Sequence, residues 1–162
     1  MTASTRSEFE VSLTPRNAAA LRLELWLGIF MVPAFWPLDW FVVPDRVWLT
    51  LVIRLLCTTI GLGILLRERL VPGWIARHVG PLAFCFSLLV AWSIALMCFL
   101  HRGYESPYYA GVNLLNMAVG LLFSWPTVMA VGFNLAIYAF YMAPLVLGLT
   151  PINDLPIALS NQ

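Results

Sequence analysis

Five long apolar stretches, separated by short polar segments, constrain this chain more than any other feature of its sequence. They run for roughly 18–25 residues, which is long enough for a helix to cross a hydrocarbon layer of about 30 Å. The composition agrees, because 61% of the residues are hydrophobic and 10% are charged, against about 45–50% and about 25% in soluble domains. The predicted fold class is therefore all-α, a polytopic membrane helix bundle with five transmembrane helices. A chain of 162 residues leaves no room for a separate soluble domain.

The polar segments between the apolar stretches define the ends of the predicted spans. The first span contains Pro33 and Pro37, which remove backbone hydrogen bonds and predict a kink. The N-terminal leader is polar and carries Glu8 and Glu10, which is not typical of a cleavable signal peptide. The expected segments are a cytoplasmic leader at 1–22, a transmembrane bundle at 23–149 with spans at 23–43, 47–66, 82–100, 107–123 and 128–149, and a short tail at 150–162.

Arginine placement predicts the orientation of the bundle. Cytoplasmic loops of membrane proteins carry an excess of Lys and Arg. With a cytoplasmic N-terminus, that side of the bundle carries Arg6, Arg16, Arg22, Arg67, Arg69 and Arg77, and the opposite side carries Arg46 and Arg102. We therefore expect the N-terminus in the cytoplasm, and five spans then leave the tail on the outer side.

Motifs for catalysis, metals and nucleic acid are missing from the sequence. It contains no glycine-rich phosphate loop, HExxH, GxSxG or paired-carboxylate motif. His78 and His101 lie at opposite ends of the third span, about 34 Å apart at 1.5 Å per residue, so they cannot share a metal ion. Cys57, Cys85 and Cys98 lack CxxC spacing and are expected to serve as small buried hydrophobic residues. The net charge of +1, without a basic tract, indicates no nucleic-acid partner. We expect neither enzymatic activity nor a cofactor.

Two charged residues lie within the predicted spans. Asp39 lies just over one helical turn before the outer end of the first span, and Arg54 lies about two turns into the second span from the same side. An unpaired arginine in hydrocarbon costs at least about 2.5–3.5 kcal/mol. Pairing with Asp39, or with Glu105 nearby, would offset much of that cost. Such a pair either fixes the register of the two helices or forms the polar floor of a ligand pocket that opens to the outside.

The polar stretch HRGYESPYYAG, residues 101–111, separates the third and fourth spans. Ser106 suits a helix N-cap and Pro107 suits the first helical position, while Glu105 complements the positive end of the helix dipole. The tyrosines at positions 104, 108 and 109 fit an interfacial aromatic belt. This stretch is either a turn that anchors the fourth span or the rim of a pocket.

Amide side chains extend the polar character beyond this turn into the apolar helices. Asn113 and Asn116 lie in the fourth span, where they are expected to point into the bundle. Asn134 in the fifth span is placed to hydrogen-bond with them, because polar side chains hydrogen-bond across helices in membranes.

The segment GYESPYYAGVNLLNMAVGLLFSWP resembles a pattern in the N-terminal membrane domains of bacterial sensor histidine kinases and class III nucleotide cyclases. In those domains, a Ser-Pro-Tyr-Tyr-Ala-Gly-x-Asn segment opens the fourth span. The first half, with GIFMVPAFWPLDWFVVP and then LVIRLLC, is similar to the membrane domain of the sensor kinases for α-hydroxyketone autoinducers. The similarity covers roughly Trp26 to Thr150, and the SPYYAG block is its most specific part.

The resemblance implies a six-helix input module in the bacterial inner membrane, which passes a signal through its last helix to a cytoplasmic kinase or cyclase output domain. The sequence ends at ALSNQ, about where that sixth helix would begin, so we expect a module that lacks its last helix. The candidate ligand-binding residues are Glu105, Tyr108, Tyr109 and Asn113, which match the motif, together with Asp39 and Arg54, which are chosen on physical grounds.

Two functions from different classes follow. The first is a membrane sensor that binds a small, fairly apolar ligand from the outer face and transmits the signal through helix repacking. The alternative is a non-catalytic accessory subunit of a larger bacterial membrane complex, respiratory or photosynthetic, with other membrane subunits as partners. A transporter is disfavoured because the sequence lacks the inverted repeats and paired broken helices of that class. The lipid bilayer is a partner in every case.

Overall fold

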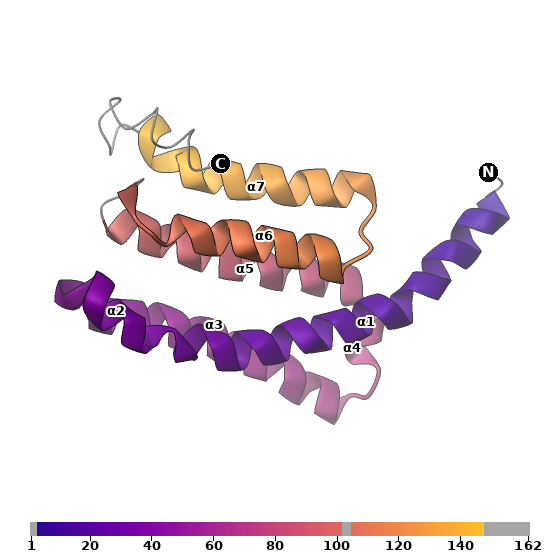
Figure 1. Cartoon of the computed structure of the whole chain (residues 1–162). Helices are drawn as coiled ribbons and strands as arrows, with labels where there is room; N and C mark the ends of the chain where they lie inside the picture. The colour runs from indigo at the N-terminus through magenta and orange to yellow at the C-terminus, as the bar shows by residue number, and fades with distance from the viewer. Residues whose placement is uncertain (1–2, 102–104, 148–162) are drawn as a thin grey trace.

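The computed structural model describes residues 3–101 and 105–147, and its regular elements there are all helices (Figure 1). They are α1 (Ala3–Ala34), α2 (Trp36–Val42), the 3₁₀ helix η1 (Pro44–Arg46), α3 (Val47–Leu70), α4 (Trp74–Arg77), α5 (Val79–Leu100), α6 (Tyr109–Leu122) and α7 (Thr127–Val146). The predicted all-α class is confirmed. The predicted tail at 150–162 and Tyr104 of the polar stretch lie outside the described residues.

Three helical segments are long and apolar enough to cross a membrane: Pro44–Leu70, Val79–Leu100 and Thr127–Pro144. The pair Leu13–Ala34 and Trp36–Val42 makes a fourth span if the two helices are taken together. The helix α6 is also apolar, but it has 14 residues and measures about 21 Å at 1.5 Å per residue. The described residues therefore give three or four candidate spans and do not confirm the predicted five.

The first span is bent where the sequence predicts a kink. The axes of α1 and α2 differ by 41° across a break at Phe35, which lies between Pro33 and Pro37. Proline lacks the N–H that an uninterrupted helix needs, so this spacing breaks the hydrogen-bond ladder. Helix α1 itself continues without a break past residue 22, so the predicted boundary of the leader coincides with no change in secondary structure.

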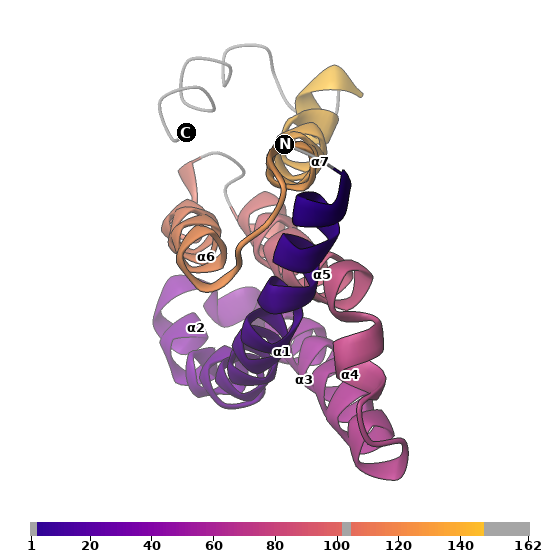
Figure 2. The same ribbon diagram turned by 90° about the vertical axis from the view of Figure 1, so that its right-hand side faces the viewer.

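The helix α5 lies at the centre of the bundle. It packs against α1, α3, α6 and α7, with α6 and α7 on one side and α1 and α3 on the other (Figures 1 and 2). Half of the most apolar 18-residue window of α5 is buried, against 22% and 17% of the corresponding windows in α3 and α7. The peripheral helices therefore carry most of the apolar surface.

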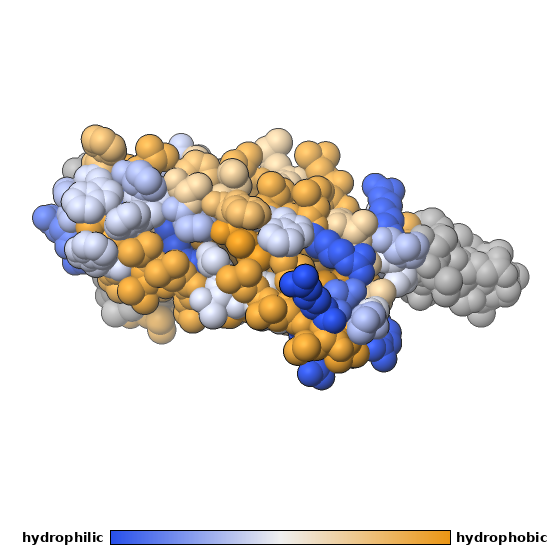
Figure 3. Space-filling model, turned by 90° about the horizontal axis from the view of Figure 1, so that it is seen from below, coloured by the Kyte–Doolittle hydropathy of each residue, from blue (hydrophilic) through white to orange (hydrophobic). Residues whose placement is uncertain are grey.

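That surface is unlike the surface of a soluble domain. Large apolar side chains stand exposed along the outer helices, among them Phe41, Val52, Leu121 and Val128. Figure 3 shows an extensive hydrophobic surface, with most of the strongly hydrophilic residues on this face gathered toward the end that carries the N-terminal segment. Soluble monomers rarely expose contiguous apolar patches larger than a few hundred Å². The structure is compatible with a multi-pass membrane protein.

The segment 67–81, predicted as a loop, is mostly helical. The helix α3 continues to Leu70, α4 follows, and α5 already begins at Val79, while the chain reverses at Gly73 with φ of +78°, a conformation that favours glycine. Glu68 holds this region together, because it accepts hydrogen bonds from Arg22 Nη2 at 2.7 Å and from the Ile75 backbone N–H at 2.7 Å. These contacts connect α1, α3 and α4.

Candidate ligand cavity and its polar end

The two charged residues of the first and second predicted spans form a buried ion pair. Arg54 Nε donates to Asp39 Oδ2 at 2.9 Å, and Nη2 donates to Oδ1 at 2.8 Å. Asp39 is 0% exposed and Arg54 is 6% exposed. The short η1 turn makes α2 and α3 antiparallel neighbours, which brings the two side chains to the same depth. The predicted pairing with Asp39 is confirmed, and the other predicted partner, Glu105, is exposed.

Two further hydrogen bonds extend the pair into a cluster. The Tyr108 hydroxyl donates to Asp39 Oδ1 at 2.6 Å, and Arg54 Nη1 donates to the backbone carbonyl of Val32 at 2.9 Å. The cluster thus joins α1, α2, α3 and the residue before α6. A buried charge is tolerated only when its hydrogen-bonding groups are satisfied. Arg54 carries five N–H donors, of which these contacts use three.

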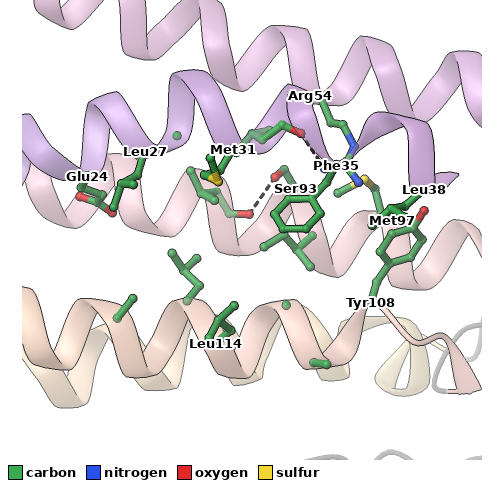
Figure 4. Close-up of a pocket in the computed structure, with 18 of the residues that line it drawn as sticks. Glu24, Leu27, Met31, Phe35, Leu38, Arg54, Ser93, Met97, Tyr108 and Leu114 are labelled. Carbon is green, nitrogen blue, oxygen red and sulfur yellow. Dashed lines mark hydrogen bonds between the residues drawn. The ribbon is translucent and has the colours of Figure 1, made fainter.

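The cluster closes one end of a cavity of about 620 Å³ (Figure 4). Helices α1 and α6 face each other across it, with α5 along its side. Small-molecule sites occupy about 300–1,000 Å³. Its walls are mainly apolar, and they include Leu27, Met31, Phe86, Val90, Leu114 and Leu115. Its polar lining residues are Glu24, Asp39, Arg54, Ser93 and Tyr108.

The structure separates the six predicted site residues into two groups. Asp39, Arg54 and Tyr108 come together and line the cavity. The remaining three, Glu105, Tyr109 and Asn113, are not among its lining residues. Tyr109 packs instead against a small cluster of α5 and α7 side chains, and Asn113 is half-buried on α6. Their role as ligand-binding residues stays a prediction.

The start of α6 differs from the prediction by two residues. The helix begins at Tyr109 rather than at Pro107. Ser106 is fully buried, and its hydroxyl accepts a hydrogen bond from the Tyr108 N–H at 3.4 Å. It stabilises a turn before the helix, and this turn directs the Tyr108 side chain toward Asp39.

Glu24 on α1 is a charged lining residue that the sequence analysis did not predict. It is 6% exposed, and its Oε1 accepts a hydrogen bond from Ser87 Oγ on α5 at 2.6 Å. The sequence contained the signal, because Glu24 is a carboxylic acid within the first predicted span, as Asp39 is. Applying the same rule for intramembrane charges to both residues would have identified it.

Amide side chains join α6 to α7, and α1 to the turn between them. Asn116 Nδ2 donates to Asn134 Oδ1 at 2.9 Å, which confirms the predicted contact between the fourth and fifth spans. Asn17 on α1 makes a reciprocal pair with the backbone of Ser124: its Nδ2 donates to the carbonyl at 3.3 Å, and its Oδ1 accepts from the N–H at 3.0 Å. The second contact fixes the turn between α6 and α7 against α1.

The histidines lie at the two ends of α5, as predicted. His78 precedes the helix and His101 follows it, so they cannot bind one metal ion together. Within residues 3–101 and 105–147, no group of three His, Cys, Asp or Glu side chains is placed to hold a metal ion. Cys57 and Cys98 are buried, as predicted, but the prediction is wrong for Cys85, which is exposed.

The fold and the site define a helical bundle with an apolar cavity that ends at a buried charge cluster. Comparisons with models of protein families, with curated proteins and with solved structures found no match. The cavity offers a mainly apolar lining, with the Asp39–Arg54–Tyr108 cluster at one end.

Proposed function

We propose that this chain is a membrane-embedded input module of a signal-transduction protein, which binds a small ligand in the cavity between α1, α5 and α6. The observation that carries the proposal is the buried Asp39–Arg54–Tyr108 cluster at the end of an apolar cavity of about 620 Å³. A charge pair that only fixed helix register would not need a cavity beside it. Intramembrane ionisable groups that line a cavity are functional-site candidates by default.

In this proposal the module lies in the bacterial inner membrane with a cytoplasmic N-terminus and crosses it five times. The arginine distribution supports the orientation. The antiparallel course of α5, α6 and α7 supports α6 as a crossing segment (Figure 1). Its 14 residues are short for a span, and a short helix is accommodated by local thinning of the bilayer. The cluster at Asp39 then lies near the outer face, where a ligand would enter.

The signal would travel through helix packing. Tyr108 precedes α6 and Asp39 belongs to α2, so the bond between them couples the two walls of the cavity. A ligand that fits one spacing of these walls better than another shifts the population toward that spacing. The resemblance to sensor kinases and cyclases supports a cytoplasmic kinase or cyclase domain as the recipient. In this proposal the chain catalyses no reaction itself.

A second candidate function is an accessory subunit of a larger membrane complex. The exposed apolar side chains on α3 and α7 favour it, because they suit contact with helices of another subunit as well as contact with lipid. The polar cluster would then be structural.

Native mass spectrometry of the chain, purified from its own membranes in a mild detergent, separates the two functions. The sensor proposal predicts a non-covalent small-molecule adduct that Ala118→Trp removes, because Ala118 lines the cavity. Leu121→Trp is the matched control, since Leu121 lies on the same helix but is 79% exposed. A chain without an adduct, bound to a stoichiometric membrane subunit, would contradict the sensor proposal and favour the accessory one.

A further inference from the structure

The carboxyl group of Glu24 has an unmet hydrogen-bonding capacity in the wall of the cavity. Its Oε1 is held by Ser87, but its Oε2 is buried and has no hydrogen-bond partner among the described residues. Within an apolar bundle, a buried acceptor without a partner is costly. Glu24 nevertheless lines the cavity (Figure 4), and the terminal torsion of a glutamate is broad. A small rotation can therefore turn a carboxyl oxygen toward a donor inside the cavity.

Glu24 and the charge cluster lie at opposite ends of the same cavity. In Figure 4 the labelled Glu24 is at one end of the view and Tyr108 at the other. Along α1, Glu24 precedes Val32, whose carbonyl accepts from Arg54, by two turns, or about 12 Å at 1.5 Å per residue. The lining between them is apolar, with Leu27 and Met31 from α1. The cavity thus suits an elongated molecule with an apolar middle.

The donor character of the ligand follows from these contacts. We propose that the cavity takes an elongated, mainly apolar alcohol, whose hydroxyl group donates a hydrogen bond to the Glu24 carboxyl. A hydroxyl both donates and accepts, so it satisfies the free Glu24 oxygen whether the carboxyl is ionised or protonated, whereas an ether or a ketone satisfies it only when the carboxyl is protonated. An ammonium group would need an ionised Glu24 as its counter-charge, and the desolvation of two buried charges can exceed the gain from pairing them, whereas a hydroxyl carries no charge into the cavity. This inference rests on the proposed function, because it assumes that the cavity is a ligand site.

Two probes of equal chain length test the donor directly. Tritiated 1-decanol and decyl methyl ether are titrated against the purified full chain in nanodiscs, with binding corrected for partition into empty nanodiscs. Wild-type protein should bind the alcohol more tightly than the ether, by up to about tenfold, because the hydroxyl can both donate and accept while the ether can only accept. Glu24→Leu should lower this ratio to about one while the ether still binds. Thr59→Ala is the control and should keep the ratio, since the exposed Thr59 hydroxyl donates to the Leu55 carbonyl of its own helix and Thr59 is not among the residues that line the cavity.

The outcomes distinguish failure of the alcohol inference from failure of the proposed ligand-binding function. Equal affinity of the wild type for both probes, or a ratio that Glu24→Leu leaves unchanged, would overturn the alcohol inference while the cavity remained a ligand site. Absence of saturable binding of either probe would overturn the proposed function as well. Glu24→Met, which is closer in shape, is a second variant in case Glu24→Leu does not accumulate. The wild-type comparison requires no variant at all.

Discussion

The Asp39–Arg54 pair predicts strongly non-additive effects of mutation on stability. Arg54→Met removes the guanidinium and leaves the Asp39 carboxylate, which is 0% exposed, with the Tyr108 hydroxyl as its remaining described side-chain donor from this cluster. Asp39→Leu leaves Arg54 bonded only to the Val32 carbonyl among its described contacts. Each single variant thus leaves a buried charge unpaired, whereas the double variant removes both charges.

The magnitudes follow from the contacts. Removing one partner of a buried ion pair costs about 3–5 kcal/mol, and both hydrogen bonds of this pair are short, at 2.8 and 2.9 Å. The double variant keeps only the cost of the unpaired neutral groups at Val32 and Tyr108, about 1–3 kcal/mol for each, and each single variant carries one of these two costs in addition to its unpaired charge. We therefore expect the double variant to be no less stable than either single variant. The coupling free energy should be at least about 2 kcal/mol, within the range seen for residues in direct contact.

The assay is equilibrium unfolding of the purified chain in mixed micelles, with the folded fraction followed by near-ultraviolet circular dichroism. Arg46→Met is the matched control, because Arg46 is exposed at the same end of the bundle and donates to the Leu100 carbonyl. It should change the free energy of unfolding by less than about 1 kcal/mol. Additive single effects, with the double variant about 6–10 kcal/mol below wild type, would refute the reasoning.

Three further predictions use the same unfolding assay. Gly61→Leu should destabilise the fold by about 1–3 kcal/mol, because a Cβ at Gly61 would lie 3.3 Å from the Phe86 ring. Gly63→Leu is the control and should be nearly neutral, because a Cβ at Gly63 would meet nothing within 4 Å. Equal effects of the two variants would contradict the packing of Gly61 against Phe86. Asn116→Leu should cost about 0.6–2 kcal/mol through loss of its amide partner on α7, and an unchanged midpoint would show that the contact contributes nothing. Asn17→Leu should lower the free energy of unfolding by about 1–3 kcal/mol, since it leaves the Ser124 backbone N–H without its partner in the turn between α6 and α7. Hydrogen exchange at that turn should become faster, and unchanged exchange would contradict the prediction.

Sequence alone predicted the features that depend on local properties. Hydropathy and run length located α3, α5 and α7 within a few residues, because a span must be long and apolar whatever it packs against. The prolines predicted the bend at Phe35 for a local reason, the missing N–H groups. The pairing of Asp39 with Arg54 was predictable because a tight turn places both at one depth.

The sequence did not predict how the helices face one another, or the features that depend on this arrangement. The cavity exists because α1 and α6 lie across from each other along α5, and no local pattern encodes that arrangement. The sequence placed Glu105 and Tyr109 at the pocket because they belong to the same polar stretch as Tyr108. Only Tyr108 reaches Asp39, since the turn at Ser106 directs neighbouring side chains to different sides.

The central claim is that occupancy of the cavity changes the packing of α1 against α6. Spin labels on cysteines introduced at Leu23 and Leu121, both exposed, in a chain whose native cysteines are replaced by alanine, report the distance between these helices by pulsed electron–electron double resonance. The account predicts that saturation with 1-decanol or with decyl methyl ether shifts the distance distribution, and that Ala118→Trp, which fills the cavity, abolishes the response to both. Identical distributions with and without a saturating probe would contradict it.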